Sequence, residues 1–145
     1  MNGWHVSVYR LAEPAPLIGI RDVSALLARF SVETEREELR KALVKGERLA
    51  VWQAHLGGLG WIDELVEARR TLEFSNNGYP NTYVALARDL TPQILNGPAL
   101  ARSVWIAGSE DIILPGWEGE TVVDTAGIAE CSSNEWLIVE AWDES

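Results

Sequence analysis

Histidines and a cysteine are the side chains of this sequence most suited to act as a catalytic base or nucleophile. His55 ends a predicted strand just before Gly57-Gly58, and Asp63 and Glu64 follow in a predicted helix. A histidine oriented by a carboxylate is the usual arrangement of a general base. His55 with Asp63 or Glu64 is therefore the candidate catalytic site. A strand-end histidine with satisfied hydrogen bonds is the commoner interpretation.

The single cysteine, Cys131, is a weak candidate nucleophile. Its neighbourhood is acidic, which raises the pKa of a thiol and lowers the fraction of reactive thiolate. One cysteine also excludes an intrachain disulfide and a CxxC motif. His5 and His55 form neither an HxH nor an HExxH pattern, so the three or four ligands of a zinc site are missing. We predict neither a metal nor a cofactor.

The glycines of HLGGLGW do not have the spacing of a nucleotide-binding loop. A dinucleotide site needs GxGxxG after a strand, whereas Gly57, Gly58 and Gly60 follow a different order. Both lysines of the chain, Lys41 and Lys45, lie near a predicted helix rather than in a phosphate loop. The GxSxG pattern of serine hydrolases is also missing. The motifs therefore favour a protein that is not an enzyme.

Paired carboxylates offer a second route to an enzyme. Glycosidases hold two carboxyl groups about 5 to 9.5 Å apart across a sugar, and Trp117 lies beside Glu118 and close to Glu120. A chain with 22 Asp and Glu among 145 residues contains such pairs by chance. A small hydrolase with a His/carboxylate or paired-carboxylate site therefore stays an alternative.

The acidic residues are distributed unevenly along the chain. There are 12 Lys and Arg against 22 Asp and Glu, a net charge of −10, and every basic residue lies at or before Arg102. Residues 103–145 hold the whole acidic excess. Such a segment repels nucleic acid and anionic lipid and attracts a basic protein surface. We expect a basic protein as the partner, with neither nucleic acid nor membrane bound directly; the oligomeric state stays open.

The segment 109–120 combines an aromatic side chain with several carboxylates. A tryptophan surrounded by charges of one sign is typical of the centre of a protein interface. Equally, Trp117 fits the role of a core residue beneath a long loop. The predicted partner-binding residues are Glu110, Asp111, Trp117, Glu118, Glu120 and Asp124.

The hydrophobic pattern predicts helices mainly in the first half of the chain. Apolar residues repeat at helical spacing from Val23 to Phe30 and from Trp61 to about Arg69. Between them, Thr34 with Glu37 forms a capping box for a helix that ends at Gly46. Further helices are predicted from Thr91-Pro92, and from a cap at Asp124 through Cys131.

Strands are predicted over 4–11, 48–56, 71–75, 82–86, 103–107 and 135–142. The stretch NNGYPNTY, residues 76–83, contains the turn signal Asn77-Gly78, but Pro80 lengthens the connection. We interpret it as a strand connection rather than a ligand loop. The last strand has apolar residues on both faces, which is typical of the centre of a sheet.

These elements predict an α+β fold, with a mostly antiparallel sheet of about five or six strands and three to five helices packed against it. The length of 145 residues indicates a single globular domain over 1–145. The N-terminus has no signal-peptide pattern, and apolar runs are far shorter than the roughly 18 residues of a membrane span. We expect a cytoplasmic protein.

In size, charge and lack of a catalytic motif, the chain resembles small bacterial immunity proteins, which neutralise a basic toxin or nuclease. It is also similar to phage inhibitors that mimic DNA with carboxylates. The resemblance implies a small acidic inhibitor that binds a basic protein. The DNA mimic directed against a defence protein and the small hydrolase are the alternatives.

Overall fold

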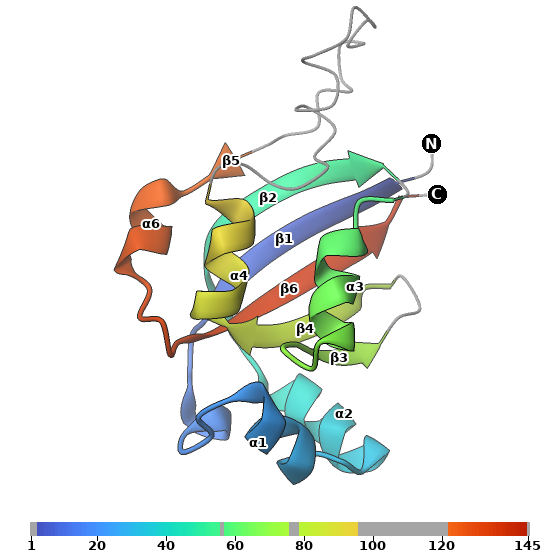
Figure 1. Ribbon diagram of the computed structural model, residues 1–145, viewed down its shortest axis with the longest axis vertical. Coiled ribbons are helices and arrows are strands. Elements are labelled where there is room, and N and C mark those ends of the chain that lie inside the picture. Colours follow the sequence, from blue (N-terminus) through green and yellow to red (C-terminus); the bar gives the residue numbers. More distant parts are fainter. Residues whose placement is uncertain (1–2, 56, 76–78, 96–121, 145) are drawn as a thin grey trace, which may run out of the picture.

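A computed structural model describes residues 3–55, 57–75, 79–95 and 122–144. Its centre is a six-stranded sheet in which every neighbouring pair of strands is antiparallel, in the order β3-β4-β6-β1-β2-β5 (Figure 1). The predicted α+β class, with a mostly antiparallel sheet, is confirmed. The strands are β1 (Gly3–Leu11), β2 (Lys45–His55), β3 (Leu72–Ser75), β4 (Asn81–Leu86), β5 (Val122–Val123) and β6 (Trp136–Asp143).

The described residues form five α-helices and one short 3-10 helix. In Figure 1, α3 and α4 lie in front of the sheet, whereas α1 and α2 lie together at its lower end. The helices are η1 (Ala15–Leu17), α1 (Val23–Arg29), α2 (Glu33–Ala42), α3 (Gly60–Glu67), α4 (Ala87–Ile94) and α6 (Thr125–Glu130).

The sheet separates two hydrophobic clusters. The larger cluster joins Trp52 of β2 and Val139 of β6 to the apolar sides of α3, α4 and α6. The smaller cluster joins Ile138 of β6 to Leu26 of α1 and Leu39 of α2. The strand β6 lies between β4 and β1, which confirms its predicted central place. Its alternate residues therefore contribute to both clusters.

The helix α3 is fixed to the sheet through its tryptophan. The rings of Trp61 in α3 and Trp52 in β2 have centroids 5.9 Å apart, and Ile62 beside Trp61 is fully buried. The apolar spacing that predicts this helix therefore marks the side that faces the sheet. Asp63, Glu64 and Glu67 consequently lie on the outer side, where they are exposed.

The predicted bounds of the second helix are wrong at its C-terminal end. The helix α2 starts at Glu33 without a side-chain cap and ends at Ala42, and Gly46 belongs to β2. A Cβ atom on Gly46 would lie 3.0 Å from the backbone nitrogen of Ala12. The glycine is therefore needed for the close approach of two chain segments, rather than for a left-handed helix cap.

The predicted start of a helix at Thr91-Pro92 is also wrong. The helix α4 begins at Ala87, directly after β4, so Pro92 lies inside it. The backbone N–H groups of Ala87 and Arg88 donate to the carbonyls of Glu135 and Ser133. Because these carbonyls satisfy the first N–H groups of the helix, no local capping residue is needed. The predicted strand 103–107 lies outside the described residues.

Candidate functional site

Of the predicted partner-binding residues, the structure describes one. Asp124 precedes α6, and its Oδ1 accepts a hydrogen bond from the backbone nitrogen of Gly127 at 2.9 Å. The prediction that Asp124 caps this short helix is therefore confirmed. Its side chain is engaged within the fold. Glu110, Asp111, Trp117, Glu118 and Glu120 lie outside the described residues.

The residues of the predicted catalytic dyad lie on two different elements. His55 ends β2, and its Nδ1 accepts a hydrogen bond from the backbone nitrogen of Gly57 at 3.2 Å. Asp63 and Glu64 lie on the exposed side of α3. The structure therefore places His55 and the two carboxylates on different elements. Their joint role as a general base and its orienting acid stays a prediction.

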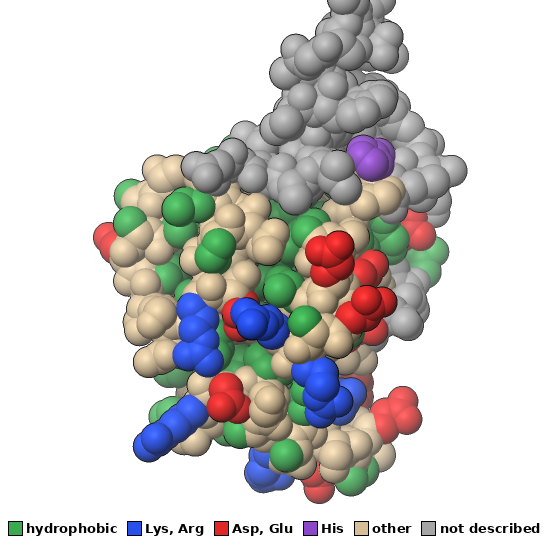
Figure 2. All heavy atoms as spheres, viewed as in Figure 1, with side chains coloured by type: hydrophobic (Ala, Val, Ile, Leu, Met, Phe, Trp, Pro, Cys, Tyr) green, Lys and Arg blue, Asp and Glu red, His purple; other side chains and the backbone are tan. Residues whose placement is uncertain are grey.

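Asp63 belongs instead to a group of carboxylates at the front of the molecule. We call this group the acidic face; it consists of Asp63, Glu64 and Glu67 on α3 and Glu73 on β3. Figure 2 shows Asp and Glu side chains gathered beside α3, with most of the Lys and Arg side chains on this view lower down. Burial and the nearby Glu67 carboxylate raise the pKa of Asp63.

Glu73 extends the acidic face from the helix onto the sheet. Burial, followed by the charge of Asp63, raises the pKa of Glu73, and a hydrogen bond with Tyr83 opposes this rise. Both carboxyl groups therefore have pKa values shifted upward. An upward shift means that burial and repulsion outweigh any attraction from neighbouring cations. The acidic face thus presents negative charge that the described fold does not neutralise.

Two polar residues of β4, Tyr83 and Asn81, lie close to Glu73. Glu73 and Tyr83 are opposite each other in the β3–β4 pair, and the amide nitrogen of Asn81 donates to the Tyr83 hydroxyl at 3.4 Å. Tyr83 is 1% exposed, and burial raises its pKa. The phenol is therefore protonated at neutral pH and can donate to the Glu73 carboxylate.

Sequence reasoning missed Glu73, Asn81 and Tyr83 as members of this group. The prediction that NNGYPNTY connects two strands is confirmed, since β3 and β4 pair antiparallel on either side of it. A register drawn from the Asn77-Gly78 turn would have placed Glu73 opposite Thr82, because the shift in register between Glu73 and Ser75 is not visible in the sequence. The approach of α3 to β3 is a tertiary contact, and no local pattern encodes it.

Cys131 lies beside a separate ion-pair network. Arg10 makes a bidentate contact with Glu135, with Nε–Oε2 at 2.6 Å and Nη2–Oε1 at 2.9 Å. Burial and the charge of Glu135 raise the pKa of the Cys131 thiol. The thiol is therefore protonated at neutral pH and makes a poor nucleophile. Within the described ranges, no three His, Cys, Asp or Glu side chains come together as a possible metal site.

Comparisons with protein-family models, with curated proteins and with solved structures gave no match. Among the helices that the structure describes, none has both the length and the apolar character to cross a bilayer.

Proposed function

We propose that this protein is a small acidic inhibitor of the immunity type, which binds and neutralises a basic protein such as a toxin or a nuclease. The observation that supports it most is the acidic face, where four carboxylates gather on α3 and β3 with Asp63 and Glu73 shifted upward in pKa. Gathering like charges lowers the stability of a fold. Such a cost is common at binding sites.

The charge of the whole chain adds to the local field. A net charge of −10 attracts a basic partner at long range, and the acidic face orients it at short range. A partner lysine or arginine that approaches Asp63 lowers the pKa of this carboxyl towards its ordinary value. By linkage, binding then becomes tighter as the pH rises through the pKa of free Asp63.

The experiment compares two variants that remove the same number of charges. One variant is Asp63→Asn/Glu67→Gln/Glu73→Gln on the acidic face. The matched control is Glu33→Gln/Glu35→Gln/Glu38→Gln on α2, where all three side chains are exposed. Each immobilised protein is incubated with lysate of the source cell at about 50 mM and about 500 mM NaCl, so that screening differs strongly. Retained proteins are identified and then purified.

We expect the wild type and the α2 control to retain the same basic protein at low salt and to release it at high salt. The acidic-face variant should associate with the purified partner at a rate at least about tenfold lower than that of the wild type. The activity of the partner should fall as one equivalent of the wild type is added. Equal retention by both variants would remove the acidic face from the proposal.

A DNA mimic is a special form of the same inhibitor. The carboxylates of the acidic face would then occupy the DNA-binding surface of a defence protein. If the retained protein binds DNA, and DNA competes with the wild type for it, the DNA-mimic form is supported. A partner that binds DNA and this protein simultaneously excludes that form.

A further inference from the structure

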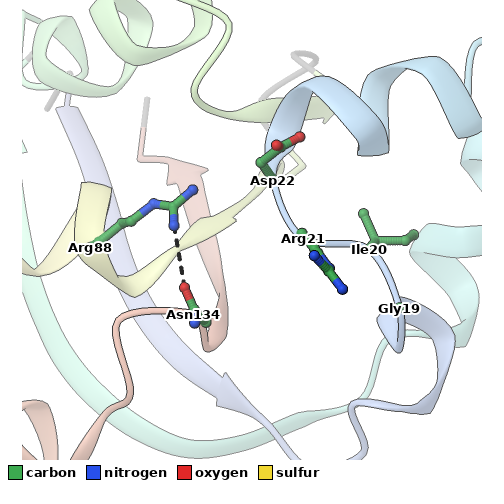
Figure 3. Close-up of a pocket in the computed structure, with 6 residues that line it drawn as sticks. All are labelled: Gly19, Ile20, Arg21, Asp22, Arg88 and Asn134. Atoms are coloured by element: carbon green, nitrogen blue, oxygen red, sulfur yellow. Dashed lines mark hydrogen bonds between the residues drawn. The ribbon is translucent and has the colours of Figure 1, made fainter.

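Two adjoining hollows at the lower part of the molecule have four arginines among their lining residues: Arg21, Arg69, Arg70 and Arg88. One has a volume of about 610 Å³ and the other about 270 Å³, and Asp22 and Arg88 line both. Figure 3 shows the larger hollow, with Arg88 and Asn134 on one side and residues 19–22 on the other. We call this region the arginine groove; its charged residues are Arg21, Asp22, Arg69, Arg70, Arg88 and Asp89.

The two carboxylates of the groove are already engaged in the fold. Asp22 caps α1, since its Oδ1 accepts from the backbone nitrogen of Ala25 at 2.8 Å. Asp89 accepts from Arg70 at 3.2 Å. An incoming cation would compete with these contacts, whereas an anion bound by Arg21, Arg69 and Arg88 would leave them in place.

The arginines, in contrast, keep most of their donors available. Arg88 donates one N–H to Asn134 at 3.2 Å, which orients its guanidinium (Figure 3). In the described part of the chain, the side chains of Arg21 and Arg69 have no ion pair or hydrogen bond, and both are exposed. Arginine presents five N–H donors in a planar fork. The groove therefore offers unused donors to an anion.

The backbone at Arg69 shows that one of these arginines occupies an unfavourable position. Its φ angle is 60°, and it follows α3 where the backbone nitrogens of Arg69 and Arg70 donate to the carbonyls of Val66 and Leu65. These two hydrogen bonds define a Schellman motif, whose left-handed residue is usually glycine. A side chain there lowers stability, and such strain is often found where a residue has a function.

We propose that the arginine groove binds a compact ligand that carries two or more phosphate groups. Guanidinium forks match phosphate oxygens in bidentate geometry, and the larger hollow, at about 610 Å³, has the size of small-molecule sites, about 300 to 1,000 Å³. The net charge of −10 opposes a long polyanion, which would also have to run along acidic surfaces. A short di- or triphosphate is small enough to lie against the arginines of the groove, where they outnumber the two carboxylates. The net negative charge of the chain thus disfavours phosphate binding overall, whereas the arginines of the groove favour it locally.

The test uses inorganic pyrophosphate, ADP and a short glutamate-rich peptide as probes, titrated by calorimetry at about 150 mM NaCl. The variant Arg21→Gln/Arg69→Gln removes two side chains that hold no described partner, so its fold should be unaffected. The matched control Lys41→Gln/Arg48→Gln removes the same charge from two other exposed positions.

We expect saturable binding of pyrophosphate by the wild type, about tenfold weaker in the groove variant and changed less than about twofold in the control. Equal affinity for ADP and pyrophosphate supports phosphate alone as the recognised group; tighter ADP binding supports a nucleotide as its source. If the affinity for pyrophosphate falls equally in both variants, the effect comes from net charge alone and the proposal is overturned. Binding of the acidic peptide in place of pyrophosphate, or no saturation with either phosphate probe, overturns it as well.

Discussion

Glu67 gives the sharpest test of the repulsion within the acidic face. It is the last residue of α3, four positions after Asp63 and three after Glu64. Each like-charge neighbour at these spacings costs about 0.2–0.5 kcal/mol. A negative charge in the last helical turn costs roughly 0.3–0.5 kcal/mol more through the helix dipole. Replacement Glu67→Gln should therefore raise the free energy of unfolding at pH 7 by about 0.7–1.5 kcal/mol.

The pH dependence follows from the raised pKa of Asp63. A carboxyl with a raised pKa in the folded state contributes stability that is fully present below its unfolded pKa and is lost as the pH rises through its folded pKa. Removing Glu67 lowers this pKa towards its ordinary value. The gain from Glu67→Gln should therefore appear at pH 7 and vanish near pH 3, where Asp63, with its raised pKa, is protonated and no longer repels a charge at position 67.

The assay is urea denaturation at both pH values, with thermal unfolding beside it. A gain of this size shifts the midpoint temperature by about 2–5 °C in a chain of this length. The control Glu38→Gln on α2 removes a charge that has Glu35 three positions earlier and Lys41 three positions later. Because repulsion and attraction at these spacings are about equal, it should give no gain. If Glu67→Gln stabilises equally at pH 3 and pH 7, or destabilises at pH 7, repulsion on the acidic face is not the cause.

Three further experiments test other parts of the structure by denaturation. Arg69→Gly should stabilise the protein by about 1 kcal/mol, since glycine adopts the left-handed conformation freely; a loss contradicts this. A double-mutant cycle of Arg10→Met with Glu135→Gln should give a coupling of about 1–2 kcal/mol, because the contact is bidentate and partly buried; additive effects contradict it. Gly127→Ala places a Cβ 2.6 Å from Oδ2 of Asp124 and should cost about 1 kcal/mol through the lost cap; an unchanged stability contradicts it.

Local sequence signals predicted those parts of the fold that local forces determine. The two-faced apolar pattern of β6 requires burial on both sides, so its central place follows from sequence. The cap at Asp124 needs only residues within one turn, and it is present. The α+β class follows from such elements taken together.

The arrangement of the functional candidates depends on contacts between distant segments. Glu73 joins Asp63 because α3 lies against the β3 end of the sheet, and the sequence separation gives no sign of this. The arginine groove likewise combines the loop before α1 with the end of α3 and the start of α4. The composition revealed the net charge but not that four arginines converge.

Pro92 shows how a long-range contact overrides a local rule, and it supports a final prediction. Thr91-Pro92 is a typical helix start, yet α4 begins at Ala87 because the carbonyls of Ser133 and Glu135 accept its first N–H groups. Pro92 then lies in the interior, where it cannot donate to the carbonyl of Arg88 four residues earlier.

Replacement Pro92→Ala should restore this hydrogen bond and raise the free energy of unfolding by about 1–2 kcal/mol. A proline in a helix interior costs about 3 kcal/mol. The expected gain is smaller because α4 already accommodates Pro92 in part. Alanine also gives the unfolded chain more conformational entropy, which offsets about 0.5–1 kcal/mol of the gain. The neighbouring Gln93→Ala controls for helix propensity, and a Pro92→Ala protein less stable than this control would contradict the reasoning. If Pro92→Ala and Arg69→Gly both stabilise, the chain keeps one unfavourable residue in the arginine groove, Arg69, and a second in the helix that carries Arg88. The cost at Arg69 is expected of a functional site rather than of an inert surface.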